Sequence, residues 1–166
     1  MLEMASRVEP EMKVVRMTKK ARLPTRATPR SAGLDLYSAY QFDLEQGESC
    51  VVKTDLCIQV PEGYYARIVE RSSWAKEYGV IVCGGVIDED YRGEVKIILH
   101  NLSSSDYRFQ PGVKIAQVVC QKVCYPTVRE VKDLDETIRG TQGFGSSNEP
   151  PEQFLAERLG KRSISE

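Results

Sequence analysis

Short β-rich segments recur along the chain, and in one of them hydrophobic and polar positions alternate with a period of two, the pattern that β-strands with one buried face produce. Residues 56–60 alternate in this way up to the turn Pro61-Glu62-Gly63, and the residues that follow predict a second strand over 64–69. Residues 76–78 allow only a short helical turn after Ser72-Ser73. The pattern therefore predicts strands, not helices, as the main elements.

The middle of the chain predicts a pair of strands and one long strand. Residues 80–86 and 94–99 flank the acidic segment 88–93 and are expected to pair as a hairpin. A strand over 113–123 follows the turn Gln110-Pro111-Gly112, and its length predicts a bend or bulge. Short strands separated by turns at about ten-residue spacing are typical of a β-sandwich or β-barrel.

Composition limits the function classes. The 166 residues include 23 Lys+Arg and 24 Asp+Glu, a net charge of −1, whereas a dedicated nucleic-acid binder normally shows a basic excess. The longest apolar run, around residues 80–83, ends at Gly84-Gly85 and is too short to span a membrane. The first twelve residues carry acids where a signal peptide has a cationic start. We expect an intracellular protein, cytoplasmic or nuclear, with no membrane association and no stable nucleic-acid binding.

Cysteine and histidine offer little for a metal site. The five cysteines form no C-x-x-C pair, and Cys120 and Cys124 are not expected to come close enough to form a disulfide. We expect the cysteines to be small buried residues in a reducing compartment. His100, the single histidine, lies in the strand pattern of residues 97–100, which favours a strand side chain over a catalytic base. A structural zinc site is therefore not expected.

The two ends of the chain differ from the middle. We expect residues 1–12 to form a flexible N-terminal segment and residues 13–138 to form the β domain. A glycine-rich segment follows at 139–147. Residues 148–166 form a polar tail that we expect to be disordered.

Three segments combine glycine, hydroxyl and arginine residues as a phosphate site does: residues 29–33, 71–73 and 139–147. Glycine lets the backbone approach an anion, while hydroxyl, amide and guanidinium groups donate hydrogen bonds to it. Ordinary turns use the same residue types, so each segment alone is a weak signal. Because there is neither a Walker lysine pattern nor a GxGxxG, the three together favour a phosphate site outside the P-loop and Rossmann classes.

The acidic segment is a candidate for a general base or a metal contact, since Asp88 and Asp90 lie two positions apart. From this spacing alone, a solvated loop with ordinary carboxylates is the better interpretation. Phe144 is unusual among glycines, and an aromatic residue there favours stacking on a planar ligand.

Taken in order, these segments resemble the five sequence motifs of the trimeric dUTP pyrophosphatases, the dUTPase family. The third motif, GGVIDEDYRG at 84–93, is the most specific of them. The others are PRSAGLDLYSA at 29–39, RSSWA at 71–75, FQPGVKIAQVV at 109–119 and RGTQGFGSS at 139–147. The resemblance extends from about Lys13 to Ser147.

The resemblance implies an all-β jelly-roll, or distorted β-barrel, that forms a homotrimer with a swapped C-terminal arm and active sites built from all three chains. It implies Mg²⁺-dependent hydrolysis of dUTP to dUMP and pyrophosphate, which lowers dUTP and supplies dUMP for dTTP synthesis. Asp88 would be the general base that activates water for in-line attack on the α-phosphorus. Tyr91 would pack under the deoxyribose, and the main chain around Cys83, Gly85 and Val86 would read the uracil edge.

The remaining site residues also follow from the resemblance. The phosphates would be bound by Arg71, Ser72, Ser73, Gln117 and Arg139, with the fifth-motif residues Gly143, Gly145 and Ser146. Phe144 would stack on uracil when that segment closes as a lid. Asp35 would support Mg²⁺ indirectly, through waters; the alternative for Asp35 is a buried partner for a neighbouring basic group. Mg²⁺ itself would be held mainly by the phosphates of the substrate.

Two motifs depart from the family pattern. In the second motif Glu70 adds a negative charge beside Arg71. Ser73 replaces a glycine whose backbone favours positive φ, and Trp74 replaces a smaller leucine. In the fifth motif Gln142 replaces a glycine and Ser147 a threonine, so the lid would close less freely. We expect activity with altered affinity.

Two other functions stay open. One is a dUTPase-fold protein that has lost catalysis and binds a protein partner; the altered second motif and the tail favour it, and the intact third motif opposes it. The other is a deoxycytidine triphosphate deaminase on the same fold. Such an enzyme has no water-activating aspartate at the hairpin, so the third motif opposes this function too.

Overall fold

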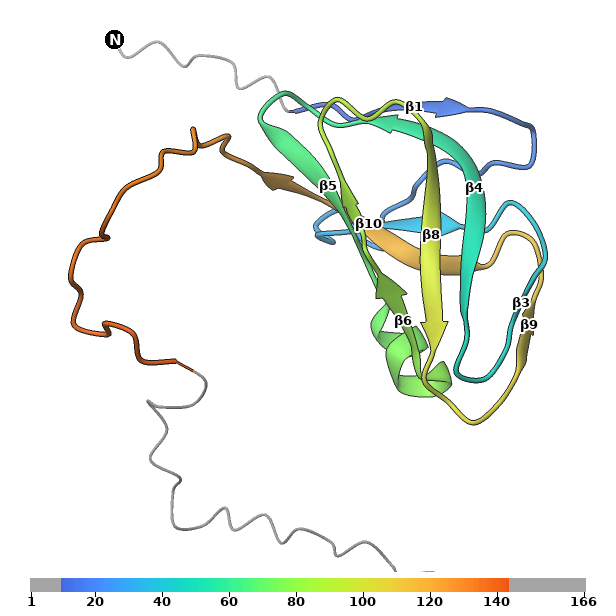
Figure 1. Ribbon diagram of the computed structural model, residues 1–166. Coiled ribbons are helices and arrows are strands. Elements are labelled where there is room, and N and C mark those ends of the chain that lie inside the picture. The colour runs from blue at the N-terminus through green and yellow to red at the C-terminus, as the bar shows by residue number, and fades with distance from the viewer. Residues whose placement is uncertain (1–9, 144–166) are drawn as a thin grey trace, which may run out of the picture. The chain divides into compact units, whose positions relative to one another are not determined.

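The computed structural model describes residues 10–143. The chain divides into two units, one ending at Tyr125 and the other beginning at Pro126 (Figure 1). Within residues 10–143 the elements are ten strands and one short helix, all of them in the first unit, which confirms the predicted all-β jelly-roll class. The predicted tail 148–166 and most of the predicted N-terminal segment lie outside the described residues. No helix among the described residues is long and apolar enough to cross a membrane.

The first sheet is antiparallel and has the order β1-β4-β8-β6. Its strands are β1 (Lys13–Arg16), β4 (Ser49–Gln59), β8 (Glu94–Asn101) and β6 (Val80–Cys83). Strand β8 shows the clearest alternation, because every second residue from Val95 to Asn101 is buried and the residues between them face outward. The inner face of this sheet supplies about half of the core.

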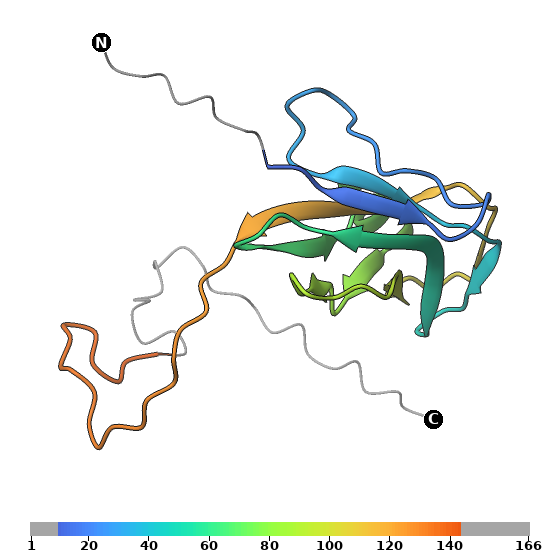
Figure 2. The same cartoon turned by 90° about the horizontal axis from the view of Figure 1, so that it is seen from above.

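The second sheet forms the other layer (Figures 1 and 2) and has the order β2-β10-β5-β7. Its strands are β2 (Leu34–Tyr37), β10 (Lys114–Lys122), β5 (Tyr64–Val69) and β7 (Val86–Ile87). Strand β5 has the predicted bounds. Strand β10 carries an irregularity between Lys114 and Ala116 where it pairs with β2, which confirms the predicted bulge.

A third, two-stranded sheet joins β3 (Phe42–Leu44) and β9 (Tyr107–Phe109) beside the helix η1 (Trp74–Tyr78). The helix confirms the predicted short helical turn. Trp74 is buried and stacks on Phe109 with ring centroids 4.5 Å apart. The bulk of Trp74, a departure from the family pattern, is therefore accommodated by an aromatic cluster in the core.

The expected strand over 80–86 is two strands, and this expectation was wrong in part. Residues Val80–Cys83 pair with β8 as expected, but β7 leaves that sheet and pairs with β5. The break lies at Gly84 and Gly85, whose φ angles of 74° and 93° turn the chain from one layer to the other. The backbone N–H of Ile68 donates to the carbonyl of Gly85 at 2.7 Å and fixes this crossing.

The cysteines were expected to be buried, and this was wrong for all five. Four are half-buried, Cys124 is exposed, and all are free thiols. Cys50 and Cys120 do pack against the core, and burial raises the pKa of both thiols. Cys83 lies opposite Ile98, an outward residue of β8, so it shares the outer face of the first sheet.

Candidate active site

The first group of site residues surrounds Asp35 in β2. Asp35 is only 7% exposed and lies between two cations. Arg71 Nε donates to Asp35 Oδ1 at 3.1 Å, and Lys114 Nζ lies 2.8 Å from Oδ2. Arg71 Nη1 also donates to the carbonyl of Lys114 at 3.3 Å. The guanidinium is thus held in one orientation by contacts to the neighbouring strands β2 and β10, while part of it remains exposed.

The carboxylate of Asp35 forms an ion pair with both Arg71 and Lys114. Its hydrogen bond and its charge raise the pKa of Lys114. The arrangement matches the alternative of a buried partner for basic groups, and it leaves each Asp35 oxygen facing a cation. Lys114 was not among the predicted site residues, although it lies within the fourth motif.

Gln117 in β10 belongs to the same group. It is paired in register with Asp35 on one side and with Val69 on the other. Its side-chain amide lies so close to Gly33 that a Cβ at that position would overlap with it. The missing side chain of Gly33 leaves space for the amide of Gln117, and Asp35, Arg71 and Gln117 lie close together.

The departures in the second motif leave Arg71 in place. Ser73 has φ −64° in the right-handed helical region, so this position needs no glycine in this chain. Ser72 is exposed and Ser73 half-buried in the turn that opens the helix. Glu70 is exposed, and among the described residues Arg71 pairs with Asp35.

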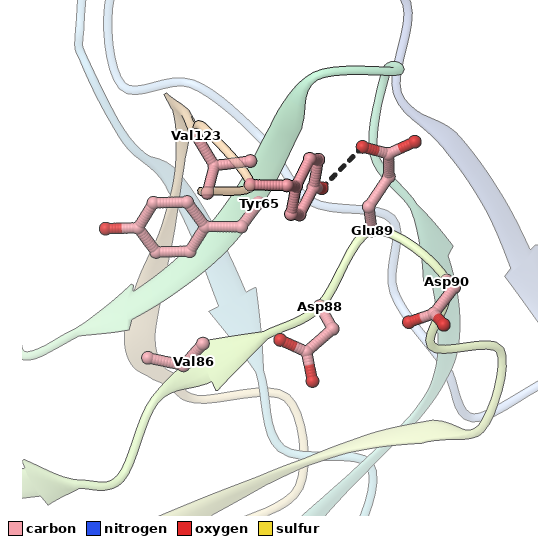
Figure 3. A pocket seen from close by; sticks show the side chains of 7 residues that line it. Tyr65, Val86, Asp88, Glu89, Asp90 and Val123 are labelled. Carbon is pink, nitrogen blue, oxygen red and sulfur yellow. Dashed lines mark hydrogen bonds between the residues drawn. The ribbon is translucent and has the colours of Figure 1, made fainter. Parts of the chain in front are cut away.

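The second group of site residues lies in the loop after β7. Asp88 is exposed at the edge of a cavity of about 550 Å³ (Figure 3), whose lining residues are Tyr65, Val86, Asp88, Glu89, Asp90, Val123 and Tyr125. The N–H of Tyr91 donates to the Asp88 carbonyl at 3.2 Å and closes a turn. The Tyr91 hydroxyl donates to the carbonyl of Glu94 at 3.0 Å. The hydroxyl lies over Gly93, where a Cβ would come within 2.5 Å of its oxygen.

Cys83, Gly85 and Val86 lead into this loop. Cys83 ends β6, Val86 begins β7, and Gly85 between them rests on the backbone of Ile68. A Cβ on Gly85 would lie 2.5 Å from the Ile68 carbonyl oxygen, so only glycine fits without displacement. The start of the loop that carries Asp88 is therefore fixed from β5.

The two groups lie at opposite ends of β5. Arg67 is paired with Val86 and Ala66 with Ile87, which places Asp88 near Tyr65 at the start of the strand. Val69, at the other end, is paired with Gln117 and is followed closely by Arg71. Six residues of extended chain span about 20 Å. Asp88 and Arg71 of one chain are therefore not brought together.

The fifth motif belongs to the second unit. Arg139 Nε donates to the carbonyl of Gln142 at 3.0 Å within this unit, and Gly143 is the last described residue. Phe144, Gly145 and Ser146 lie outside the described residues. Among residues 10–143, no three His, Cys, Asp or Glu side chains lie close enough to hold a metal ion by themselves.

Comparison with known proteins identifies the family. The dUTPase family model matches residues 19–148 of this chain. The deoxyuridine 5'-triphosphate nucleotidohydrolase of Arabidopsis thaliana is 48% identical over 138 residues, which cover 83% of this chain and 83% of that protein. The enzyme of the same name from Mus musculus is 43% identical over 136 residues, covering 82% and 84%. The chain belongs to the dUTPase family.

Solved structures agree with this family in fold. A mutant dUTPase of Staphylococcus bacteriophage 80alpha, solved with dUpNHpp, matches with a TM-score of 0.79 at 28% identity and covers 82% of this chain and 98% of that one. A mutant dUTPase of phage phi11 of S. aureus matches with a TM-score of 0.71 at 25% identity, covering 76% of this chain and 99% of that one. That phi11 structure concerns the coordination of a structural Mg(II) ion.

Proposed function

We propose that this protein hydrolyses dUTP to dUMP and pyrophosphate, and thereby lowers dUTP and supplies dUMP for dTTP synthesis. The observation that carries the proposal is the third motif: an exposed carboxylate, Asp88, stands at a cavity on a loop fixed by Gly85, in a chain of the dUTPase family. The proposal places the enzyme in the cytoplasm or the nucleus.

In the proposed reaction Asp88 takes a proton from a water molecule as its oxygen attacks the α-phosphorus. The bond from the α-phosphorus to the oxygen that bridges it to the β-phosphorus breaks, and pyrophosphate leaves with that oxygen. The new oxygen remains in dUMP. An exposed carboxylate suits this role, because water reaches it directly.

The phosphates carry the largest charge of the substrate, and Arg71 is the group best prepared for them. Its guanidinium is already oriented by Asp35 and by the carbonyl of Lys114, so little side-chain entropy is lost on binding. Ser72, Ser73 and Gln117 add neutral donors. Arg139, Gly143, Gly145 and Ser146 of the fifth motif complete the phosphate contacts in this proposal.

The oxygens available at the site, those of Asp35 and of the substrate phosphates, suit Mg²⁺ as a metal shared between protein and substrate. Carboxylate and phosphate oxygens are the ligands it prefers, and it commonly keeps several waters. Bound there, Mg²⁺ neutralises charge on the phosphates. Asp35 would contribute through waters, because each of its oxygens already faces a cation.

Specificity for deoxyuridine is assigned to the third motif and to Phe144. Tyr91, held over Gly93 by its bond to Glu94, would pack under the deoxyribose and leave no room for a 2′-hydroxyl. The main chain of Cys83, Gly85 and Val86 would bind the uracil edge. Phe144 would stack on the base as the fifth motif closes and excludes water.

The distance between Asp88 and Arg71 favours a site shared between chains of a homotrimer. The outer face of the first sheet supplies an apolar surface for such an assembly. Val51 and Ile98 are paired across β4 and β8 and are 60% and 41% exposed. Contiguous exposed apolar patches are typical of an interface between copies, and this pair would form part of one.

The test is pyrophosphate release from dUTP, with dCTP, dTTP and UTP in parallel, in Mg²⁺ and in excess chelator. Release from dUTP alone, lost with chelator, supports the proposal. In ¹⁸O-labelled water the label should enter dUMP and not pyrophosphate. Deamination of dCTP would point to the deaminase instead. If a folded trimer releases no pyrophosphate from any of the four nucleotides, the result would favour a partner-binding protein without catalysis.

A further inference from the structure

Glu89 lies between two exposed aspartates, but its side chain takes the opposite direction. In Figure 3 the carboxylates of Asp88 and Asp90 lie on one side of the loop and that of Glu89 on the other. Glu89 is half-buried, whereas Asp88 and Asp90 are exposed. Oε2 of Glu89 accepts two hydrogen bonds, from the backbone N–H of Gly63 at 2.9 Å and from the Tyr125 hydroxyl at 2.7 Å.

The two donors belong to the body of the domain. Gly63 lies in the turn between β4 and β5 with φ 76°, and its carbonyl accepts the N–H of Val123 at 3.0 Å. Tyr125 follows closely after β10 and is the last residue of the first unit. Through Glu89 the loop is therefore joined to one end of the second sheet, at the point where the chain leaves the domain.

The other hydrogen bonds of this loop are local. Tyr91 bonds to Asp88 and Glu94, and Arg92 Nη1 donates to the carbonyls of Glu89 at 2.6 Å and Tyr91 at 2.9 Å. Hydrogen bonds between residues so close in the sequence shape the loop, but they do not fix its position on the domain. Among the described residues, Glu89 supplies the loop's side-chain contacts to distant parts of the sequence, 26 and 36 residues away.

The contact requires an ionised carboxylate and a neutral phenol. The hydrogen bond from Tyr125, and then that from Gly63, hold the pKa of Glu89 below its ordinary value. The same bond raises the pKa of Tyr125 to about 12. Both groups therefore keep these charge states at neutral pH.

We infer that Glu89 is a positioning residue for the reaction: its bonds to Gly63 and Tyr125 hold the loop so that Asp88 stands where the water must be activated. This inference rests on the proposed function. Glu89 touches neither nucleotide nor water in this scheme and acts through Asp88. Because a small displacement of a catalytic group costs up to about a hundredfold in rate, loss of this anchor should lower kcat by about tenfold or more.

The test compares Glu89→Ala, Glu89→Gln and Tyr125→Phe with the unchanged protein, measuring kcat and KM for dUTP. Glu62→Ala is the matched control, because Glu62 is exposed in the same turn as Gly63. We expect kcat to fall in Glu89→Ala while KM changes little. We expect partial rescue in Glu89→Gln, whose amide oxygen can still accept the Gly63 N–H, and a smaller loss in Tyr125→Phe, since Tyr125 is 69% exposed.

A second measurement tests the contact between Glu89 and Tyr125 directly. Tyrosine ionisation, followed by ultraviolet absorbance, is compared between the unchanged protein and Tyr125→Phe to isolate Tyr125. The Tyr125 transition near pH 12 should move down toward 10 in Glu89→Gln. An unshifted transition would overturn the contact. An unchanged kcat in Glu89→Ala, or an equal loss in Glu62→Ala, would overturn the positioning role. An inactive unchanged protein would instead refute the proposed function.

Discussion

Arg71 Nε donates to Asp35 Oδ1 at 3.1 Å, and the ion pair is buried on the aspartate side and open on the arginine side. The buried carboxylate sets the direction of the guanidinium, while Lys114 Nζ at 2.8 Å balances its second oxygen. Orientation of this kind prepares Arg71 for an anion before the anion arrives.

Replacing Asp35 with asparagine should therefore weaken substrate binding and stability together. The amide leaves Arg71 and Lys114 without their shared negative charge, so we expect a KM for dUTP raised by about tenfold and stability lowered by about 2 kcal/mol. Steady-state kinetics and urea unfolding measure the two effects. Asp43→Asn is the control, since Asp43 pairs with Arg108 on the surface and should change neither much.

Asp88→Asn should remove turnover and keep binding. An amide cannot take the proton from water, so we expect kcat to fall by about a thousandfold with KM changed only a few-fold. Asp90→Asn is the matched control: Asp90 is also exposed, lies two positions away and has no role in the proposed reaction. If both variants lose activity to the same extent, Asp88 is not the base.

Much of the fold was predictable because strands with one buried face leave a period-two pattern in the sequence. That pattern predicted the strand over 56–60, and the turns at 61–63 and 110–112 led to the predicted strand over 64–69 and the predicted bulged strand over 113–123. The break of residues 80–86 was not predicted, because apolar residues resume at Val86 directly after Gly84-Gly85, while the backbone changes sheets there. The decisive contact, between Gly85 and Ile68, joins residues that local pattern does not connect.

The sequence motifs indicated which residues belong to the candidate site, but not all of the contacts between them. Asp35, Arg71 and Gln117, from three different motifs, lie close together because β2, β10 and β5 are neighbouring strands. Lys114 and Glu89 were missed, although both lie inside quoted motifs. Their partners are Asp35 on another strand and Tyr125 outside any motif, so no spacing in the sequence indicates these contacts.

Gly85→Ala should destabilise the loop that carries Asp88. Its φ of 93° is unfavourable for alanine, and the new methyl group would lie 2.5 Å from the Ile68 carbonyl oxygen. We expect a loss of stability of at least about 2 kcal/mol. Gly47→Ala has a similar φ of 72° with open space around it, so it should cost only about 1 kcal/mol. Equal urea midpoints for the two variants would contradict this account.

The hydrogen bond between Glu89 and Tyr125 should make part of the stability pH-dependent in both acid and alkali. The pKa of Glu89 is lowered from 4.5, so its contribution is present above 4.5 and is lost as pH falls through the lower folded value. The pKa of Tyr125 is raised from 10.0 to about 12, so its contribution is present below 10 and is lost as pH rises toward 12.

The measurement is the difference in urea midpoint between the unchanged protein and Tyr125→Phe across pH. We expect the difference to be largest between about pH 5 and 9 and to shrink in acid and in alkali. A difference that stays constant through both transitions would mean that Tyr125 and Glu89 do not interact in solution.

The separation of Asp88 from Arg71 along β5 predicts that two inactive proteins can restore each other. The purified protein should have three times the 18.7 kDa mass of one chain by light scattering. Asp88→Asn and Arg71→Ala homotrimers should each be inactive, since every site lacks one group. Unfolded together at equal amounts and refolded, they should form mixed trimers in which some sites take an intact Asp88 from one chain and an intact Arg71 from another.

If assembly is random, about a quarter of the sites in the mixture combine the two intact residues, and activity should return to about that fraction. Mixing the two folded homotrimers without unfolding is the control, because chains that do not exchange cannot share a site. Activity that stays at the level of the parents after refolding would mean that both residues serve a site within one chain. The extended path of β5 between them makes that outcome incompatible with the present fold.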